Sequence, residues 1–439
     1  MRVAVAGLWH LGTVMSACLA SGGHDVVGID ADTSVIDGLE NGRRFPVDEP
    51  GLQELTAAQK NAGRLRFSTD FRAVADREIV CIAYDTPVDD LDRADVEFVI
   101  GQVDALLAHA TPGTLVLISS QLPVGSTARL EGSHRGRGLT FAYSPENLRL
   151  GKAIQVFTQP DRVVIGARSD ADRARLQELF EPFTNELLWM SVESAEMTKH
   201  ALNAFLATSV AFINEIASLS ELVGADAQEV ERGLKTDIRI GPRAYIHPGP
   251  AFAGGTLARD IAFLQQTGAR HQIELPLFHG VRASNDLHKG WLRRALVGAL
   301  GAPAGKTLAV LGLTYKAGTN TLRRSGAIEA CQWLTENGAS VRAHDPAVSA
   351  LPADLASKVK LFSSPQEAVQ GADAVVIATE WPQFRSVTAD DLVSRMRTPV
   401  VFDAARFLEK SLPVDDRIEY YSIGKVHDSK RSKSSRHRQ

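Results

Sequence analysis

Short runs of apolar residues alternate with longer mixed stretches along most of the chain. Runs that are apolar throughout, with helical stretches between them, are typical of parallel strands covered on both faces. In the first part of the chain the predicted elements are strands over residues 2–7, 25–30, 78–84, 114–120 and 163–166 and a helix over Leu11–Ser21. The alternation restarts later, with strands predicted over residues 307–313, 340–346, 373–379 and 400–404 and a helix over Gly326–Asn337.

A different pattern separates these two regions. From Glu193 to Val223 the sequence has no glycine or proline, and apolar residues recur at helical spacing. A helix of about thirty residues is long for a globular protein. Such a helix usually bridges domains or packs against a partner subunit. The chain is therefore predicted to hold two α/β domains joined by a helical middle region.

Composition narrows the class of protein. A chain of 439 residues is too long for one core, and 44% hydrophobic with 23% charged residues is ordinary for a globular enzyme. The net charge of -4 indicates neither a nucleic-acid partner nor a membrane surface. No apolar run reaches the ~18 residues of a membrane helix, and no secretory signal is expected. The last dozen residues are basic and lack apolar side chains, so residues 426–439 are predicted to form a disordered tail.

The cysteines and histidines show no metal-site pattern. The three cysteines, Cys18, Cys81 and Cys331, lie far apart and without metal or redox spacing. The twelve histidines show no paired ligand spacing either. We therefore expect no metal site, reduced thiols and a cytoplasmic protein.

A dinucleotide site is predicted where the first strand runs into the first helix. The segment GLWHLG (7–12) stands at the place of a Gly-rich phosphate turn. Gly7 permits the tight turn, Gly12 lets the helix pack close to the sheet, and Leu11 belongs to the same turn. The helix N-terminus then faces the pyrophosphate. Trp9 replaces the middle glycine, so its side chain must point away from the phosphates.

Asp30 strengthens this prediction. It ends the next strand, eighteen residues after Gly12, where a carboxylate accepts hydrogen bonds from the adenosine ribose hydroxyls. Because a carboxylate there repels a 2′-phosphate, NAD is favoured over NADP. The alternative is a surface aspartate at the end of a strand.

Further motifs occur in a fixed order along the chain: EPGL (49–52), DTP (85–87), SPENL (144–148), PDRVVIG (160–166), DIRIG (237–241), GPAFAGGTLARD (249–260), GLTYK (312–316) and TEWPQF (379–384). With them the chain resembles the UDP-glucose/GDP-mannose dehydrogenase family from Met1 to about residue 425. The resemblance implies an α/β fold of two Rossmann-like, doubly wound parallel-sheet domains joined by a long central helix and a helical dimerisation region. The divisions it implies are an NAD-binding Rossmann domain (1–192), a central helical domain (193–300), a nucleotide-sugar-binding α/β domain (301–425) and the tail (426–439). A homodimer is expected.

The resemblance also implies the chemistry, with one residue missing. The family oxidises the C6 hydroxyl of the sugar to a carboxylate in two hydride transfers, and a cysteine thiolate holds the intermediate. That cysteine aligns with Thr256 in this sequence, whose hydroxyl is hardly ionised at neutral pH and whose β-branch crowds the attack. Arg259 replaces the lysine after the cysteine, and Gln121 replaces a threonine. Asp260, which the family uses beside a catalytic water, is retained.

The first half of the chemistry is retained. Lys199 and Asn203 are four residues apart, on one face of the long helix. They match the pair that holds the reacting hydroxyl and the oxyanion, where a cation and an amide donor stabilise the alkoxide. Their alternative is a solvated lysine and a helix-facing asparagine. Glu146 matches a general base or water-positioning group, and its alternative is a loop carboxylate paired with an arginine.

The binding residues follow from the same matches. For the substrate they are Leu148, Arg239, Tyr245, Gly249, Gly254, Gly255 and Lys316. For the cofactor Thr86 and Arg323 join the turn and Asp30. Arg406 is displaced by one position from the family arginine, so no role is assigned to it.

Three functions stay open at this point. The first is a nucleotide-sugar dehydrogenase confined to one two-electron oxidation, with UDP-glucose as the substrate that the resemblance implies. The second is a full four-electron oxidation through a hydrated aldehyde, with Glu146 or Asp260 activating water. The third is a non-catalytic sugar-nucleotide-binding protein. Retention of Lys199, Asn203, Glu146 and Asp260 argues against the third.

Overall fold

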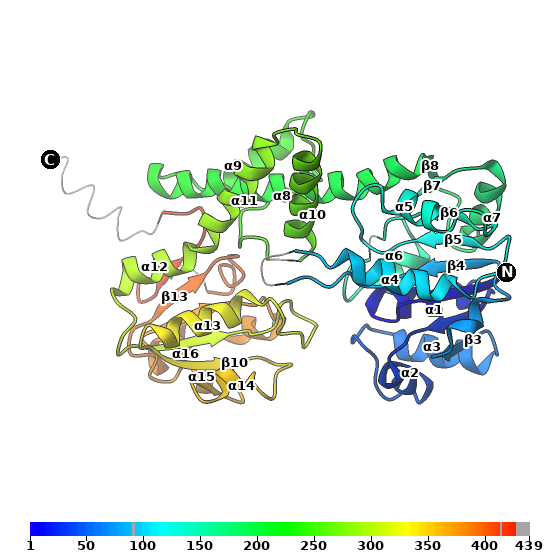
Figure 1. Ribbon diagram of the computed structural model, residues 1–439. Helices are drawn as coiled ribbons and strands as arrows, with labels where there is room; N and C mark the ends of the chain where they lie inside the picture. Colours follow the sequence, from blue (N-terminus) through cyan, green and yellow to red (C-terminus); the bar gives the residue numbers. More distant parts are fainter. Residues whose placement is uncertain (90–92, 147, 254, 413–414, 427–439) are drawn as a thin grey trace. The chain divides into compact units, whose positions relative to one another are not determined.

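The structure, a computed structural model, describes residues 1–89, 93–146, 148–253, 255–412 and 415–426. It divides into two compact units, Met1–Leu202 and Asn203–Gln439. Each unit is built around one sheet of mainly parallel strands with helices packed on it (Figure 1). From residue 427 on, the predicted tail lies outside the described residues.

The first unit contains an eight-stranded sheet in the order β3-β2-β1-β4-β5-β6-β7-β8. All neighbouring strands pair in parallel except β6 and β7, which are antiparallel. The strands are β1 (Arg2–Ala6), β2 (Asp25–Ile29), β3 (Leu65–Ser68), β4 (Ile79–Ile82), β5 (Leu115–Ile118), β6 (Thr140–Tyr143), β7 (Val163–Ala167) and β8 (Leu187–Met190).

Both faces of this sheet are buried. Along β1, Val3 and Val5 pack into one hydrophobic cluster and Ala4 and Ala6 into another, because successive side chains of a strand point to opposite faces. The helices of this unit are α1 (His10–Ser21), α2 (Thr33–Glu40), α3 (Leu52–Asn61), α4 (Val96–Leu107), α5 (Ser126–Ser133), α6 (Ala153–Thr158) and α7 (Asp170–Phe180), with a 3-10 helix η1 (Phe71–Val74). The apolar strands of the sequence are thus explained by helices on both sides.

The second unit repeats the plan with six parallel strands in the order β11-β10-β9-β12-β13-β14. Its strands are β9 (Thr307–Leu311), β10 (Ser340–His344), β11 (Val359–Leu361), β12 (Ala374–Ile377), β13 (Val400–Asp403) and β14 (Glu419–Tyr421). Its helices after the middle region are α12 (Trp291–Leu300), α13 (Gly326–Glu336), α14 (Ala353–Ala356), α15 (Pro365–Val369) and α16 (Ala389–Arg395), with a 3-10 helix η2 (Pro382–Ser386). Two Rossmann-like sheets confirm the predicted fold class.

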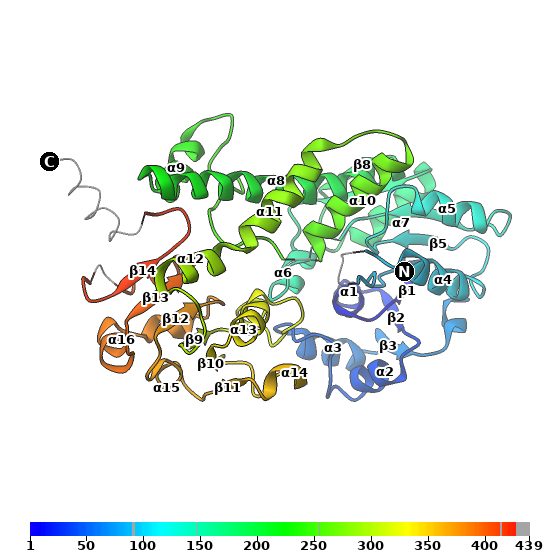
Figure 2. The ribbon, with the colours of Figure 1, turned by 60° about the vertical axis from the view of Figure 1, so that its left-hand side comes forward.

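The middle region is helical, as predicted. The helix α8 (Val192–Val223) is 32 residues long and is followed by α9 (Ala227–Thr236), α10 (Thr256–Arg270) and α11 (Pro276–Lys289). Within the second unit, Ala204, Ala207 and Ala211 of α8 pack with Ile261 of α10 and Val281 of α11. Small side chains let the three helices approach closely, and Figure 2 shows α10 and α11 beside α8.

Among the described residues, α8 is the one helix long and apolar enough to pass a test for a membrane span based on length and composition. Its mean hydropathy reaches 1.4 over 18 residues, and 44% of that window is buried inside the protein. The sequence predicts no uninterrupted apolar run of this length, and Glu193, Lys199 and Glu215 interrupt α8, so the helix passes this test by its mean hydropathy alone. A helix buried in a protein core passes the same test.

Candidate functional site

The turn between β1 and α1 is held close to the end of β4. Gly7 has a φ of +90°, and a Cβ there would lie 2.6 Å from the Cα of Tyr84. A Cβ on Gly12 would lie 1.9 Å from the carbonyl oxygen of Gly7. Both positions therefore require glycine, as expected for a phosphate turn. Trp9 precedes the helix and is 48% exposed, while Leu11 is half-buried in the first turn.

Asp30 follows β2 directly and closes this turn. The backbone N–H of Leu8 donates to Oδ2 of Asp30 over 2.7 Å, and the N–H of Asp32 donates to Oδ1 over 3.0 Å. Each carboxylate oxygen retains a further lone pair, and the residue is only half-buried. Asp30 is thus fixed by the backbone while it can still accept ribose hydroxyls.

Thr86 and Gln121, which follow β4 and β5 in the sequence, contact each other. Thr86 is almost fully buried, and its hydroxyl donates to the carbonyl oxygen of Gln121 over 2.7 Å. The predicted cofactor residue Thr86 therefore contacts Gln121, which the resemblance aligns with a threonine.

Lys199 and Glu146 form the first of two clusters on α8. The ammonium of Lys199 donates to the main-chain carbonyl oxygen of Glu146 over 2.6 Å, and Lys199 is only 5% exposed. The Glu146 carboxylate instead accepts from the backbone N–H of Leu148 over 2.7 Å. The structure brings these three predicted residues together. The alternative of a solvated lysine is excluded by its burial.

Asn203 and Asp260 form the second cluster. The Asn203 amide donates to the carboxylate of Asp260, which is fully buried in α10. Thr256 begins α10 and is exposed, and Asp260 follows it by one helical turn, on the same face of the helix. Arg259, between them, is buried.

The segment before α10 is held by three buried polar side chains. Asn214 accepts the backbone N–H of Gly249 over 3.1 Å, and Nε2 of His288 lies 2.9 Å from the carbonyl oxygen of Gly249. Asn285 accepts from the N–H of Phe252 and donates to its carbonyl over 3.0 and 2.9 Å. Burial lowers the pKa of His288, so the neutral ring donates from Nε2. The loop predicted to meet the sugar is therefore anchored through its backbone.

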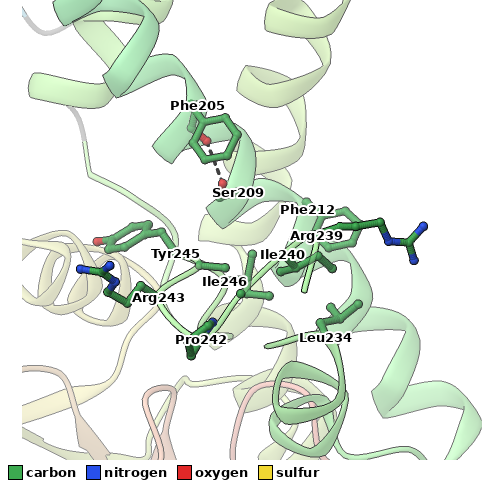
Figure 3. Close-up of a pocket in the computed structure, with 12 residues that line it drawn as sticks. Phe205, Ser209, Phe212, Leu234, Arg239, Ile240, Pro242, Arg243, Tyr245 and Ile246 are labelled. Carbon is green, nitrogen blue, oxygen red and sulfur yellow. Dashed lines mark hydrogen bonds between the residues drawn. The ribbon is translucent and has the colours of Figure 1, made fainter. Parts of the chain in front are cut away.

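Arg239 and Tyr245 line a cavity of about 640 Å³ beside α8 (Figure 3). The Arg239 side chain is 85% exposed and pairs with Asp237 over 2.7 Å, and Tyr245 is 57% exposed. Figure 3 shows the two side chains on opposite sides of the cavity. Within one chain, the structure does not bring Arg239 and Tyr245 together.

The remaining predicted residues lie near the end of β9. Lys316 and Arg323 are both exposed there. The next residue, Arg324, has a φ of +59°, and its guanidinium lies 3.5 Å from the place of a Cβ on Gly255. Sequence reasoning missed Arg324, because the unusual backbone that turns it toward Gly255 has no sequence signature. Gly254 lies outside the described residues.

Arg406 has a structural role that the sequence left unassigned. Its Nη1 donates to the carboxylate of Asp226 over 2.7 Å, and its Nη2 donates to the carbonyl oxygen of Ile423 over 3.0 Å. Asp226 also caps α9. The arginine therefore ties α9 to the C-terminal segment.

The chain matches known domains and proteins along its length. Residues 1–184 match the NAD binding domain of the UDP-glucose/GDP-mannose dehydrogenase family, residues 193–287 its central domain and residues 309–410 its UDP binding domain. A UDP-glucose 6-dehydrogenase of Rhizobium meliloti is 37% identical over 97% of this chain and 100% of its own length. The chain belongs to this family.

Other relatives agree with this assignment. A UDP-glucose 6-dehydrogenase of Pseudomonas aeruginosa is 34% identical over 97% of this chain and 98% of its own length. The structure of a UDP-glucose dehydrogenase from Pyrobaculum islandicum is 30% identical, with a TM-score of 0.87 over 97% of this chain and 98% of that one. A UDP-D-ManNAc dehydrogenase from Pyrococcus horikoshii is 26% identical, with a TM-score of 0.84 over 97% and 99%. This member of the family is an NAD-dependent nucleotide-sugar dehydrogenase.

The cysteines of this dehydrogenase are all inert by position. Cys18 lies in α1, Cys81 in β4 and Cys331 in α13, and none of the three has any exposed surface. Burial raises the pKa of each thiol to about 12. Burial therefore strongly disfavours the reactive thiolate form of all three cysteines at neutral pH.

Glu49 is a second residue whose place sequence reasoning missed. It belongs to the EPGL motif, which served only as evidence of resemblance, yet its carboxylate contacts Nε2 of His10 over 3.0 Å. It also accepts from the backbone N–H groups of Gly151 and Ala153. The motif was the only signal in the sequence, because these partners lie far apart along the chain.

Proposed function

We propose that the enzyme oxidises a hydroxyl of a UDP-hexose resembling UDP-glucose and stops after one hydride transfer. The observation that carries this proposal is the state of the three cysteines, which are buried with pKa values near 12. Thr256 stands where the resemblance places the nucleophile, and threonine is a poor substitute for a thiolate.

NAD fits the turn after β1. The absence of a Cβ at Gly7 and Gly12 leaves the backbone turn close to the sheet, and Asp30 presents acceptors for the adenosine ribose. Leu11, Thr86 and Arg323 are the other residues we assign to the cofactor. Bound NAD supplies the hydride acceptor.

The protein's own contribution to hydride transfer is electrostatic. As a substrate hydroxyl loses its proton, the buried ammonium of Lys199 and the amide of Asn203 stabilise the alkoxide. Lys199 is already oriented by the carbonyl oxygen of Glu146, and the Asn203 amide has one N–H beyond the one that Asp260 accepts. We assign the proton to Glu146, whose carboxylate is half-buried.

The reaction stops for a chemical reason. A carbonyl carbon can give up a second hydride only after a nucleophile has added to it. In the cysteine mechanism this adduct is a thiohemiacetal. Thr256 does not form the corresponding hemiacetal, because its hydroxyl stays protonated and the β-branch of its side chain crowds the attack. The product we propose is therefore an aldehyde or ketone.

Three of the substrate residues we assign are glycines that precede α10 in the sequence. Gly249, Gly254 and Gly255 allow backbone contact with the sugar and pyrophosphate, and the anchoring of Gly249 by Asn214 and His288 supports this role. We further assign Leu148, Tyr245 and Lys316 to the nucleotide sugar. The boundaries at residues 192 and 300 stay a prediction.

A second copy of the chain is proposed as the partner. Phe205, Phe212 and Leu219 are 69%, 47% and 57% exposed on α8, and they are spaced seven residues apart, which forms one stripe along a helix that pairs with another. A second α8 would cover this stripe and the adjoining cavity. Arg239, at 85% side-chain exposure, would then reach the neighbouring subunit's sugar.

The second candidate is a four-electron oxidation without a covalent intermediate. It is favoured by relatives named UDP-glucose 6-dehydrogenase at 37% and 34% identity. In this reaction Glu146 or Asp260 would activate the water that hydrates the aldehyde. Asp260 is fully buried and bonded to Asn203, which leaves it poorly placed to take a proton from bulk water.

Product analysis tests the proposal. The protein is incubated with NAD and a panel of UDP- and GDP-hexoses in the presence of hydroxylamine, and the products are identified by mass. An oxime of a UDP-hexose that has lost two hydrogens is expected. A sugar carboxylate as the main product would favour the four-electron reaction and overturn the proposal.

A further inference from the structure

Glu49 joins two segments of the first unit that are far apart in sequence. Its side chain is only 1% exposed. Oε1 accepts from the backbone N–H of Ala153 over 2.7 Å, and Oε2 accepts from the N–H of Gly151 over 2.8 Å. The carboxylate therefore fixes the chain where it enters α6.

The same carboxylate reaches the cofactor turn. Nε2 of His10 lies 3.0 Å from Oε2 of Glu49, and His10 is the first residue of α1. The N-terminus of α1 is the end that faces the dinucleotide pyrophosphate in this fold. One buried side chain thus connects the cofactor turn with Gly151 and Ala153.

The segment ahead of Gly151 carries the reacting groups. Glu146 precedes it by five residues, receives the Lys199 ammonium on its carbonyl oxygen and holds the N–H of Leu148 with its carboxylate. A displacement at Gly151 would consequently be passed to the carbonyl oxygen that orients Lys199. All of these contacts lie within residues 1–202.

Packing encloses this junction on one side only, where Ala153 is buried in the hydrophobic core and Ile154 and Phe157 pack against it. Glu49, Gly51, Gly151 and Lys152 line a cavity of about 640 Å³, so side chains do not fill the other side of the junction. On the side that faces the cavity, the backbone of Gly151 is held by its hydrogen bond to Glu49. Leaving one partner of a buried hydrogen bond unpaired carries the full desolvation cost of that group.

We propose that Glu49 and His10 are positioning residues that hold the cofactor turn, Glu146 and Leu148 in one arrangement, so that NAD binding orders the sugar side of the site. This inference rests on the proposed roles of Glu146 and Lys199. His10 contacts Glu49 only from the cofactor turn. Glu49 contacts both the cofactor turn and the segment at Gly151 and Ala153.

The two residues make different predictions for steady-state kinetics. In His10→Phe an aromatic ring stays but the hydrogen bond to the Glu49 carboxylate is lost, so KM for NAD rises about tenfold, the loss expected for one hydrogen bond to a charged group. KM for the sugar nucleotide stays the same. In Glu49→Gln one oxygen is replaced by an amide NH₂ group that faces donors. KM for NAD therefore rises about tenfold, and kcat also falls about tenfold. His10→Gln, which can still donate, restores most of the NAD affinity.

A double-mutant cycle and a matched control complete this test. Once Glu49 is glutamine, His10→Phe adds less than about twofold to KM for NAD, because the two residues act through one contact. Glu54→Gln removes an exposed carboxylate from the same cavity and changes neither constant. Additive effects of the two substitutions, or a lowered melting temperature with unchanged KM and kcat, would overturn the proposal.

A measurement without turnover separates this inference from the proposed function. Hydrogen–deuterium exchange of residues 148–158 is followed with and without NAD, and the NAD dissociation constant is measured by calorimetry. NAD protects this segment in the wild type and not in Glu49→Gln. Equal protection in both proteins contradicts the inference, whatever sugar is oxidised, whereas failure to oxidise any sugar nucleotide contradicts only the proposed function.

Discussion

At the scale of single residues, the proposed chemistry depends on Thr256. Its hydroxyl stands exposed at the first position of α10, with the buried Asp260 one turn behind it. A thiol at this position would be accessible and would ionise far more readily than a hydroxyl. Position 256 is therefore accessible enough for a nucleophilic side chain, and in this sequence it holds a threonine.

Restoring the nucleophile should restore the second oxidation. In Thr256→Cys we expect the NADH released per sugar nucleotide to rise above one, with acid product and a covalent adduct on the protein detectable by mass spectrometry. Thr256→Ser removes the β-branch without supplying sulfur and should still give one NADH. If Thr256→Cys yields no acid, a residue other than Thr256 blocks the second step.

The native cysteines should be unreactive below strongly alkaline pH. Burial raises the pKa of the thiols of Cys18, Cys81 and Cys331 to about 12, so the reactive thiolate becomes abundant only as the pH approaches that value. At pH 8 iodoacetamide should label none of the three in the folded protein and all three in denaturant. Rapid labelling of one cysteine with loss of activity would show that a thiol reaches the site.

For some candidate site residues the sequence alone indicates which of them lie close together, and the reason is local. Gly7, Gly12 and Asp30 belong to one short strand–turn–helix–strand unit, so spacing alone places them. Glu49 and His10 are 39 positions apart, and only the folded sheet brings them together. Arg324 was missed for a third reason, since its approach to Gly255 depends on a left-handed backbone.

At the scale of elements, the sequence predicts strands that are apolar throughout and does not predict strands of mixed polarity. β4 and β5 are buried along their whole length and β1 from Val3 on, so all three contain continuous apolar runs. β3 and β14 are short edge strands with exposed positions, and so they lack that signature. The antiparallel pairing of β6 with β7 has no sequence signature, because pairing direction depends on the path of the connection.

The helix α8 also binds the start of α5 in the first unit through Glu196. This carboxylate is 1% exposed and accepts from the backbone N–H groups of Gly125 and Thr127 and from the Thr127 hydroxyl at 2.6 to 2.9 Å. Glu196 thus caps α5 from another helix, which no local capping pattern in the sequence could predict.

Glu196→Gln should destabilise the protein, because its amide must face one of these donors. We expect a loss of about 1–3 kcal/mol in the free energy of unfolding, measured by urea denaturation. Glu193→Gln is the control, since Glu193 pairs with Arg168 at a side-chain exposure of 45% and should cost less than about 1 kcal/mol. Equal costs for both substitutions would show that α5 does not depend on this cap.

At the scale of the whole molecule, both units have an aspartate at the end of an equivalent strand that accepts a backbone N–H from the turn after the neighbouring strand. Asp345 follows β10 as Asp30 follows β2, and it accepts from the backbone N–H of Leu313 over 2.7 Å. Asp345 also accepts from the Trp381 indole and is 4% exposed. The protein itself therefore satisfies Asp345, whereas Asp30 is half-exposed, which is consistent with dinucleotide binding in the first unit.

The exposed stripe on α8 predicts the oligomeric state. Sedimentation should give twice the chain mass of 47.4 kDa for the wild type and a single chain for Phe212→Glu, because a charge would be buried in the stripe. Leu287→Glu alters an equally apolar side chain that is 71% exposed on α11 and should remain dimeric. A monomeric wild type would leave the stripe without the partner we propose.

The central claim is that this dehydrogenase carries out one oxidation per sugar. The most direct measurement is the amount of NADH formed when a limiting, known amount of the sugar nucleotide has been consumed completely, with a trap for carbonyl products present. One NADH per sugar is predicted, because the three thiols are buried and Thr256 does not form a covalent adduct. Two NADH per sugar, with the carboxylate as product, would contradict it.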